Sequence, residues 1–450
     1  MKKAGAKMAA RPGRGGAVRT AYAELRSFSS VVSKVLRGLR KLGPGIVTGA
    51  SDDDPSGIAT YSQVGAQFGF AMLWTMLLSY PLMAGIQEIS AWIGRVTGIG
   101  IAGNIRRHYS AWVLYPVVAL LLVANVINLG ADISAMGSAL KLLVGGSALC
   151  FSIVFGLLSV VAAVFVPYRH YAQLLKWSAL VLLVYVATAF VVHVRWQSAL
   201  AGAFIPTISL STGYMTSLTA VFGTTISPYL FFWQASQEVQ EQEAAAGEKT
   251  LKRAPEQASA QLQSMRTDTY IGMAFSNVIA FFIILDTAAV LHTHGLTDIQ
   301  TAAQAAEALR PLAGELTFLL FSFGIIGTGL LAVPVLAGSA AYALAEALRW
   351  PIGLERKPDK AKGFYGTLGA ATLLGVALNF TSIDPIKALF WSAVINGVAA
   401  APIMVVMMLM TANPKVTGTL MLPLRQKVVG WSSTAVMFLV AAGMVATWGS

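Results

Sequence analysis

The stretch GASDDDPSGIAT, residues 49–60, places three adjacent aspartates and a proline inside an apolar run long enough to cross a bilayer. Pro55 and Gly57 can break a helix at that depth. Unwound backbone in mid-membrane is tolerated only where it is buried in protein or lines a wet cavity, and an ionisable residue there indicates a functional site. One of the aspartates can be explained as the N-cap of the half-helix that follows the break, but capping does not explain all three. The stretch therefore predicts a broken spanning helix with a binding site at Asp54.

The composition is that of a polytopic, all-α integral membrane protein. Of 450 residues, 56% are hydrophobic and 12% are charged, whereas soluble domains have about 25% charged residues. Windows of about 20 apolar residues predict about eleven spanning helices. The windows are 43–68, 71–93, 112–137, 147–167, 174–194, 213–235, 268–291, 314–346, 364–381, 385–410 and 430–448.

The basic residues predict the orientation. With the N-terminus inside, the inner segments hold 28 of the 32 Lys and Arg, as the positive-inside rule requires. The basic tail 1–41 lacks the apolar core of a signal peptide and suits an anionic membrane surface rather than nucleic acid. We expect a multi-pass protein of the cell inner (plasma) membrane, with the N-terminus cytoplasmic and the C-terminus outside. The long inner segment 236–267 is expected to be a solvated helical linker whose charges lie on its wet face.

A second break is predicted in FGTTISPYLFFWQASQE, residues 222–238, where Pro228 follows Thr224 and Ser227. The two broken spans are the first and the sixth, which correspond if helices 1–5 and 6–10 are inverted repeats. Paired interrupted helices of this kind indicate a transporter site between the repeats. The expected organisation is a cytoplasmic tail (1–41), a transport core (42–410), and a loop with an eleventh helix (411–450).

Other spans contain polar residues that can support such a site. Asn125, Asn128 and Asp132 share one helical face. Any one of these intramembrane polar residues is more typical of an interhelical hydrogen bond than of a ligand. Asn396 is the best further ligand candidate, because the tenth helix flanks the core. The second span adds Gln87 and Glu88.

With these motifs, the chain resembles the Nramp family of divalent-metal transporters. GPGIVTGASDDDPSGIATYSQVGAQFGFAMLW (43–74) is similar to that family's first helix, IQEISAWIGRVTG (86–98) to its second, and GTTISPYL (223–230) to its sixth. The resemblance implies a LeuT-type fold of 5+5 inverted repeats with helices 1 and 6 broken. It also implies inward transport of divalent cations, usually Mn²⁺ or Fe²⁺ with protons.

The resemblance also assigns roles to single residues. Asp54 keeps the metal-ligand aspartate, and Thr224 stands where a carbonyl contributes. The sequence departs from the family elsewhere: Gly57 replaces an Asn, Ser227 a Met and Tyr229 a His. In the third helix Asp132 is kept, but Ala135 replaces a Glu associated with proton movement.

These departures favour a hard cation. Thioether sulfur favours soft metals, whereas carboxylate, hydroxyl and carbonyl oxygens suit Mg²⁺ and Mn²⁺. The predicted site is therefore all-oxygen, and the chain looks closer to the Nramp-related magnesium transporters. Asp53, with Asp52, would ligate or attract the cation. We expect weak or no proton coupling, because Tyr does not titrate near neutral pH. The candidates for proton movement or for support of the ligands are Asp132, Tyr229, Glu88 and Gln87.

Alternative functions remain open from the sequence. One is a proton-coupled Mn²⁺/Fe²⁺ importer of the ordinary Nramp type, and another is a Na⁺-coupled organic-solute carrier of LeuT fold. Three acids at the first break would repel a substrate carboxylate, which counts against the second. A non-transporting scaffold or sensor leaves the paired breaks unexplained. We find no nucleotide-binding loop and no nucleophile–base pattern, so we expect a transporter rather than an enzyme. We also expect it to be a monomer and to use no cofactor.

Overall fold

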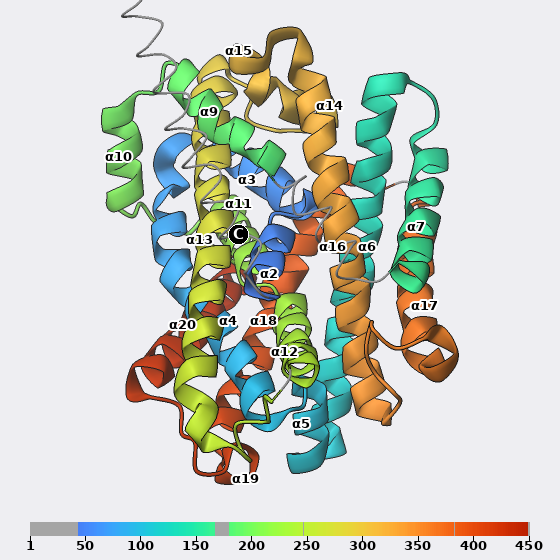
Figure 1. Ribbon diagram of the computed structural model, residues 1–450. Helices are drawn as coiled ribbons and strands as arrows, with labels where there is room; N and C mark the ends of the chain where they lie inside the picture. The colour runs from blue at the N-terminus through green and yellow to red at the C-terminus, as the bar shows by residue number, and fades with distance from the viewer. Residues whose placement is uncertain (1–43, 167–179, 246, 382, 449–450) are drawn as a thin grey trace, which may run out of the picture. The chain divides into compact units, whose positions relative to one another are not determined.

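Helices make up the regular structure of the part of the chain that the computed structural model describes, residues 44–166, 180–245, 247–381 and 383–448 (Figure 1). The expected all-α architecture is confirmed, and six of these helices are each long and apolar enough to cross a membrane. The tail 1–41 and the start of the fifth window, 174–179, lie outside the described residues. The helices are α2 (Pro44–Asp52), α3 (Pro55–Phe68), α4 (Trp74–Thr97), α5 (Ile101–His108), α6 (Ala111–Val144), α7 (Ala148–Phe165), α9 (Leu183–Val191), α10 (Trp196–Phe204), α11 (Thr212–Thr225), α12 (Pro228–Ala244), α13 (Ala258–Val290), α14 (Ala302–Ala306), α15 (Arg310–Ala313), α16 (Thr317–Leu348), α17 (Lys362–Leu378), α18 (Pro385–Ala412), α19 (Pro414–Thr417) and α20 (Leu424–Ala446).

The first spanning helix is interrupted between α2 and α3, as predicted. Asp54 is the N-cap of α3, and its Oδ1 accepts hydrogen bonds from the Gly57 amide (2.8 Å) and the Ser56 hydroxyl (2.7 Å). Pro55 takes the first helical position, where no N–H is needed. The helix restarts here because Asp-Pro-Ser is a strong N-terminal signal.

The sixth spanning helix is interrupted between α11 and α12, also as predicted. Pro228 begins α12, and Ser227 before it makes no side-chain cap. The Ser227 hydroxyl instead donates to the carbonyls of Gly223 (2.8 Å) and Thr224 (2.9 Å). The serine therefore satisfies the end of α11 rather than the start of α12.

Two glycines allow α2 to pack closely on α13. A Cβ added at Gly49 would lie 2.2 Å from the Gly272 carbonyl oxygen, and one at Gly45 would lie 2.6 Å from the Thr269 nitrogen. The Gly45 amide donates to Asp268 Oδ2 at 2.5 Å. These contacts fix the half-helix before the first break against α13.

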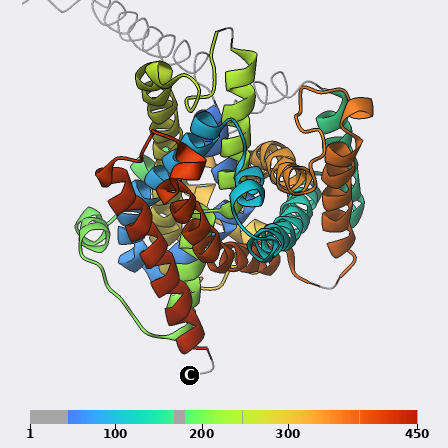
Figure 2. The ribbon, with the colours of Figure 1, turned by 90° about the horizontal axis from the view of Figure 1, so that it is seen from below.

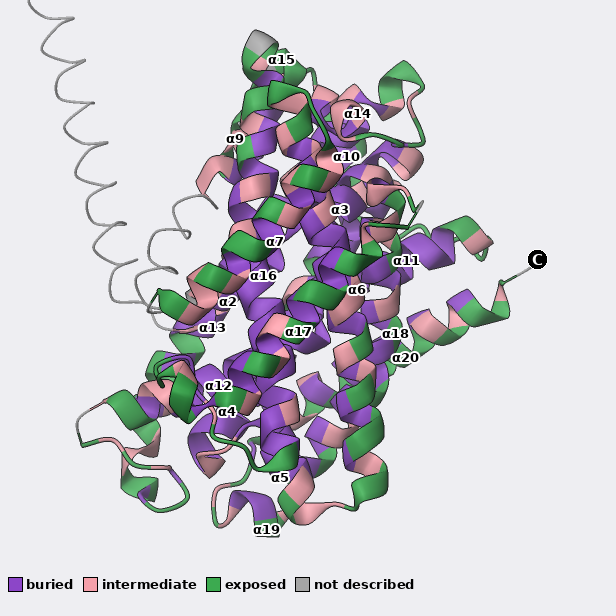
Figure 3. Ribbon diagram, turned by 90° about the vertical axis from the view of Figure 1, so that its right-hand side faces the viewer, coloured by how far each residue is buried: buried purple, intermediate pink, exposed green. Residues whose placement is uncertain are grey.

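The other long helices surround the broken ones. Helices α6, α7, α16 and α17 pack on one another, and Figure 2 shows this teal and orange group on one side of the end view. Helix α18 packs against α11 and α20. Figure 3 shows exposed stripes on the outward faces of α7 and α17. On α7 the stripe is apolar and suits contact with lipid; it includes Val154, Leu157, Leu158 and Val161.

The segment 236–267 is helical at both ends, as predicted, but its charges do not all lie on a solvated face. Its first residues continue α12 and its last ones begin α13. Arg95, only 6% exposed at the end of α4, pairs with Glu238 (2.5 Å), Glu241 (2.5 Å) and Glu248 (2.8 Å). The prediction for the charges was wrong because a polar composition does not reveal a buried arginine that is contributed by a distant helix.

Candidate functional site

The two helix breaks meet inside the protein. A Cβ added at Gly57 of α3 would lie 3.1 Å from Thr224 Oγ1 at the end of α11. The Tyr229 hydroxyl, in the first turn of α12, lies 3.0 Å from the Ser51 carbonyl oxygen and 3.3 Å from Asp54 Oδ2. Residues 175 positions apart in the sequence are thus in contact.

Four hydrogen-bond donors surround the Asp54 carboxylate, which is 1% exposed. Oδ1 accepts from Ser56 and Gly57, as described above. Oδ2 accepts from Asn128 Nδ2 of α6 (3.1 Å) and from Tyr229 (3.3 Å). A carboxylate has about four acceptor positions, so these donors occupy them and hold the side chain in one orientation.

Asp52 and Asp53 turn away from Asp54 and toward α13. Ser276 Oγ lies 2.5 Å from Asp52 Oδ2 and 3.2 Å from Asp53 Oδ1. The remaining oxygens, Asp52 Oδ1 and Asp53 Oδ2, are buried without a hydrogen-bond partner. Sequence reasoning missed Ser276, because a single serine in a continuous apolar window gives no signal of the face it occupies.

Helices α6 and α18 close another side of the site. Asn128, which donates to Asp54, accepts a hydrogen bond from Ser392 of α18 at 2.8 Å. Asp132, one turn further along α6, faces Asp54, and its buried oxygens form no hydrogen bond of ordinary geometry. Asn396, one turn beyond Ser392, is also buried with both side-chain polar atoms unpaired. Buried polar atoms of this kind are rare and indicate a role.

Gln87 and Glu88 lie away from Asp54 and have other partners. Gln87 Nε2 donates to Gln234 Oε1 of α12 at 2.9 Å. Glu88 Oε1 accepts from Arg266 Nε of α13 at 2.6 Å and from the Gln426 side chain of α20. These two residues join α4 to its neighbours, whereas Asp54, Gly57, Thr224 and Tyr229 come together at the breaks.

The site offers oxygen atoms rather than a cage of acids. No three His, Cys, Asp or Glu side chains converge on one point within the described ranges. Asp54, which Asp132 faces, therefore supplies only part of a cation shell, and neutral carbonyl, hydroxyl and amide oxygens must complete it. Such mixed oxygen sets are what Mg²⁺ and Ca²⁺ use in proteins.

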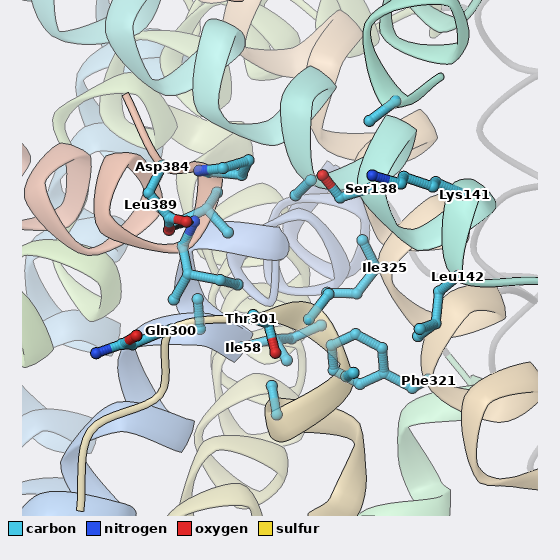
Figure 4. Close-up of a pocket in the computed structure, with 18 residues that line it drawn as sticks. Ile58, Ser138, Lys141, Leu142, Gln300, Thr301, Phe321, Ile325, Asp384 and Leu389 are labelled. Carbon is cyan, nitrogen blue, oxygen red and sulfur yellow. Dashed lines mark hydrogen bonds between the residues drawn. The ribbon is translucent and has the colours of Figure 1, made fainter. Parts of the chain in front are cut away.

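A cavity of about 570 Å³ leads toward the site from the face that bears α14 and α15. Figure 4 shows its lining, with Ile58 of α3, Ser138 and Lys141 of α6, and Leu389 of α18 around it. The Ile58 amide donates to the Asp54 carbonyl oxygen at 3.1 Å. The cavity therefore reaches within one helical turn of Asp54.

The comparisons with known proteins agree with this geometry. The family model "Natural resistance-associated macrophage protein-like" matches residues 45–447. The chain is 28% identical over 423 residues to the divalent metal cation transporter MntH of Klebsiella pneumoniae, covering 91% of this chain and 94% of the relative.

Solved structures share the fold. A manganese transporter of Eremococcus coleocola superposes with a TM-score of 0.69 at 16% identity, covering 90% of this chain and 87% of that one. MhsT, crystallised with L-phenylalanine, gives 0.58 at 14% identity, covering 90% and 97%. The LeuT-type fold with a broken first helix, expected from the sequence, is confirmed.

Proposed function

Because this chain belongs to the Nramp family, we propose that it is a secondary transporter that imports a hard divalent cation, Mg²⁺ and/or Mn²⁺. The membership makes it a multi-pass membrane protein of a transporter family and not an enzyme, as the sequence predicted. The observation that carries the proposal is the placement of Asp54 of the first break against Tyr229 of the second, inside the protein.

Selectivity for a hard ion is supported by the atoms around Asp54. The carboxylate is itself a hard oxygen ligand, and the amide, backbone N–H and two hydroxyls around it are donors that orient it. Ser227 contributes a hydroxyl where the family has a thioether, which removes the soft ligand. We place the chain with the Nramp-related magnesium transporters on this basis, with Thr224, Ser227, Asp53 and Asn396 as further ligands.

We propose that the ion keeps part of its water. Both Asp54 oxygens already accept two hydrogen bonds, so a bare ion would have to displace those donors. A bridging water needs one acceptor position, so only one of these donors has to move for a hydrated ion, and Mg²⁺ loses water reluctantly. Gly57, which adds no side chain between the breaks, leaves room for that water.

Proton coupling in this chain is proposed to be weak or absent. The residue at the second break is Tyr229, whose hydroxyl holds Asp54 rather than exchanging protons near neutral pH. The ordinary proton-coupled Mn²⁺/Fe²⁺ type remains the second candidate, because Asp132 is buried and faces Asp54.

The proposed direction follows from the basic residues. We place the N-terminus and the face of α5 and α19 in the cytoplasm, and the cavity of Figure 4 on the outer side. Ions would enter through that cavity, and the tight packing of α2 on α13 would close the other side in this conformation.

Calorimetric binding of Mg²⁺, Mn²⁺, Ca²⁺ and Cd²⁺ to purified protein tests the choice of ion. We expect Mg²⁺ and Mn²⁺ to bind and Cd²⁺ to bind no more tightly than Mn²⁺. Proteoliposomes with a pH-sensitive dye inside test the coupling, and Mg²⁺ entry should leave the internal pH unchanged. Preferred Cd²⁺ binding together with internal acidification would support the second candidate instead.

A further inference from the structure

A basic patch lies on the face of α5 and α19, far from the ion site along the helices. We define it by four side chains from three segments: Arg107 and His108 at the end of α5, Lys252 after α12, and Lys415 in α19. Figures 1 and 3 show α5 and α19 at the same end of the protein, and they are in contact. Arg107, Lys252 and Lys415 are exposed, and His108 is half-buried.

The patch is held together by specific contacts. Lys252 Nζ donates to the carbonyls of Lys415 (2.8 Å) and Val416 (3.1 Å), which leaves one of its three N–H donors for a ligand. The Lys252 amide donates to the Val96 carbonyl at the end of α4 (3.0 Å). Three segments are therefore fixed in one arrangement before any ligand binds.

Within the described part of the chain, none of the ion pairs involves a side chain of the patch. Burial, followed by Lys252, Arg107 and Lys415, lowers the pKa of His108, so these are the charges that face its ring. The acid on α16 that touches α5, Glu346, binds the opposite end of that helix through the Gly103 amide (2.8 Å). The donors that the carbonyls of Lys415 and Val416 do not occupy require an anion or water.

The position of the patch indicates a membrane headgroup. Trp112 and Tyr115, in the first turns of α6 directly after His108, are 88% and 56% exposed. Exposed Trp and Tyr at the end of a spanning helix mark the membrane–water interface. Arg107 and His108 end the preceding helix, a few residues before this aromatic pair in the sequence.

We propose that the seam between α5, Lys252 and α19 binds the phosphate headgroup of an anionic phospholipid of the adjacent leaflet. Arg107 and Lys415 attract the headgroup, the free N–H of Lys252 donates to a phosphate oxygen, and His108 adds charge when it is protonated. Each basic residue near such a surface is worth about fivefold in affinity. This site is independent of the transported ion.

The test is native mass spectrometry of the full chain with phosphatidylglycerol and phosphatidylcholine of matched acyl chains. Wild type should bind phosphatidylglycerol preferentially, and Lys252→Gln with Lys415→Gln should weaken that binding about 25-fold. The matched control is Lys360→Gln with Lys362→Gln, which removes two exposed charges from a different loop. The control should change binding less than twofold, and equal losses in the two double variants would overturn the proposal.

The affinity for phosphatidylglycerol, measured as a function of pH, gives a second test. If the two lysines had only a structural role, this pH dependence would be absent. Phosphatidylglycerol binding to wild type should tighten as the pH falls through the depressed pKa of His108, because its ring then gains a charge. His108→Gln should bind with the same affinity across that range. A wild-type affinity that does not change with pH, or equal binding of the two lipids, would contradict the site.

Discussion

The two helix breaks have the same backbone feature, a proline that starts a new helix, but the side chain before the proline differs between them. At the first, the Asp54 side chain caps the new helix and lies buried at the centre of the protein. At the second, the Ser227 hydroxyl is turned back to the carbonyls that α11 leaves free. The comparison shows that proline interrupts each helix, while the residue before the proline decides which side-chain group lies at the break. That group is a carboxyl at the first break and a hydroxyl at the second.

The largest expected effect comes from removing the charge at the first break. Asp54→Ala should lower Mg²⁺ affinity by at least about a hundredfold and abolish uptake in proteoliposomes, because it removes a carboxylate ligand. The matched variant at the second break, Ser227→Ala, should change the affinity only about threefold or less, because it removes one neutral oxygen ligand and no charge. Calorimetry and flux are the measurements, and flux in Asp54→Ala equal to that of wild type would refute the ligand assignment.

The next effect concerns packing at the same two places. A Cβ at Gly223 would lie 2.0 Å from the Ala393 carbonyl oxygen, so Gly223→Ala should destabilise the protein by about 2–3 kcal/mol. A Cβ at Gly57 meets first a side-chain hydroxyl at 3.1 Å, and Gly57→Ala should cost under about 1 kcal/mol. Thermal unfolding in detergent compares the two variants. Equal melting temperatures would show that α11 and α18 are not packed as described.

A smaller effect should follow from giving the second break a soft ligand. Ser227→Met should raise Cd²⁺ affinity about tenfold and lower Mg²⁺ affinity, since a thioether favours soft metals. Calorimetric titration of both ions checks the prediction. Unchanged Cd²⁺ binding would mean that position 227 does not reach the ion.

The smallest effect concerns the contact between the breaks. Tyr229→Phe removes a hydroxyl that holds both the Ser51 carbonyl and Asp54, a loss of about 1 kcal/mol or roughly fivefold in Mg²⁺ affinity. Asn128→Ala, which removes the other donor to Oδ2, should act similarly. Binding unaffected in both variants would show that the orientation of Asp54 does not limit affinity.

The sequence predicted the breaks because their signals are local. Asp54 before Pro55 and Ser227 before Pro228 stand out within apolar windows, and their positions in spans one and six indicate the pairing. The family match confirms the resemblance that those residues carried. The ion, the coupling and the ligand set stay predictions.

Other features could not be predicted, because they depend on which face of a helix meets which neighbour. Nothing around Ser276 indicates that it faces Asp52 and Asp53. The same limit explains why Glu238 was assigned to a wet surface when it pairs with Arg95 in the interior. Apolar windows predict how deep a residue lies in the membrane. They do not predict the rotation of the helix about its axis, which decides the neighbour that each side chain faces.

The Arg95 cluster has a mechanical consequence. One guanidinium joins α4 to three glutamates on and after α12, so those two helices cannot separate without exposing four charges. We therefore expect α4 and α12 to move together in any conformational change. Helix α12 is joined to α16 by neutral donors instead: Ser236 donates to Glu346 at 3.3 Å, and the side chains of Gln237 and Gln240 donate to the Tyr342 hydroxyl.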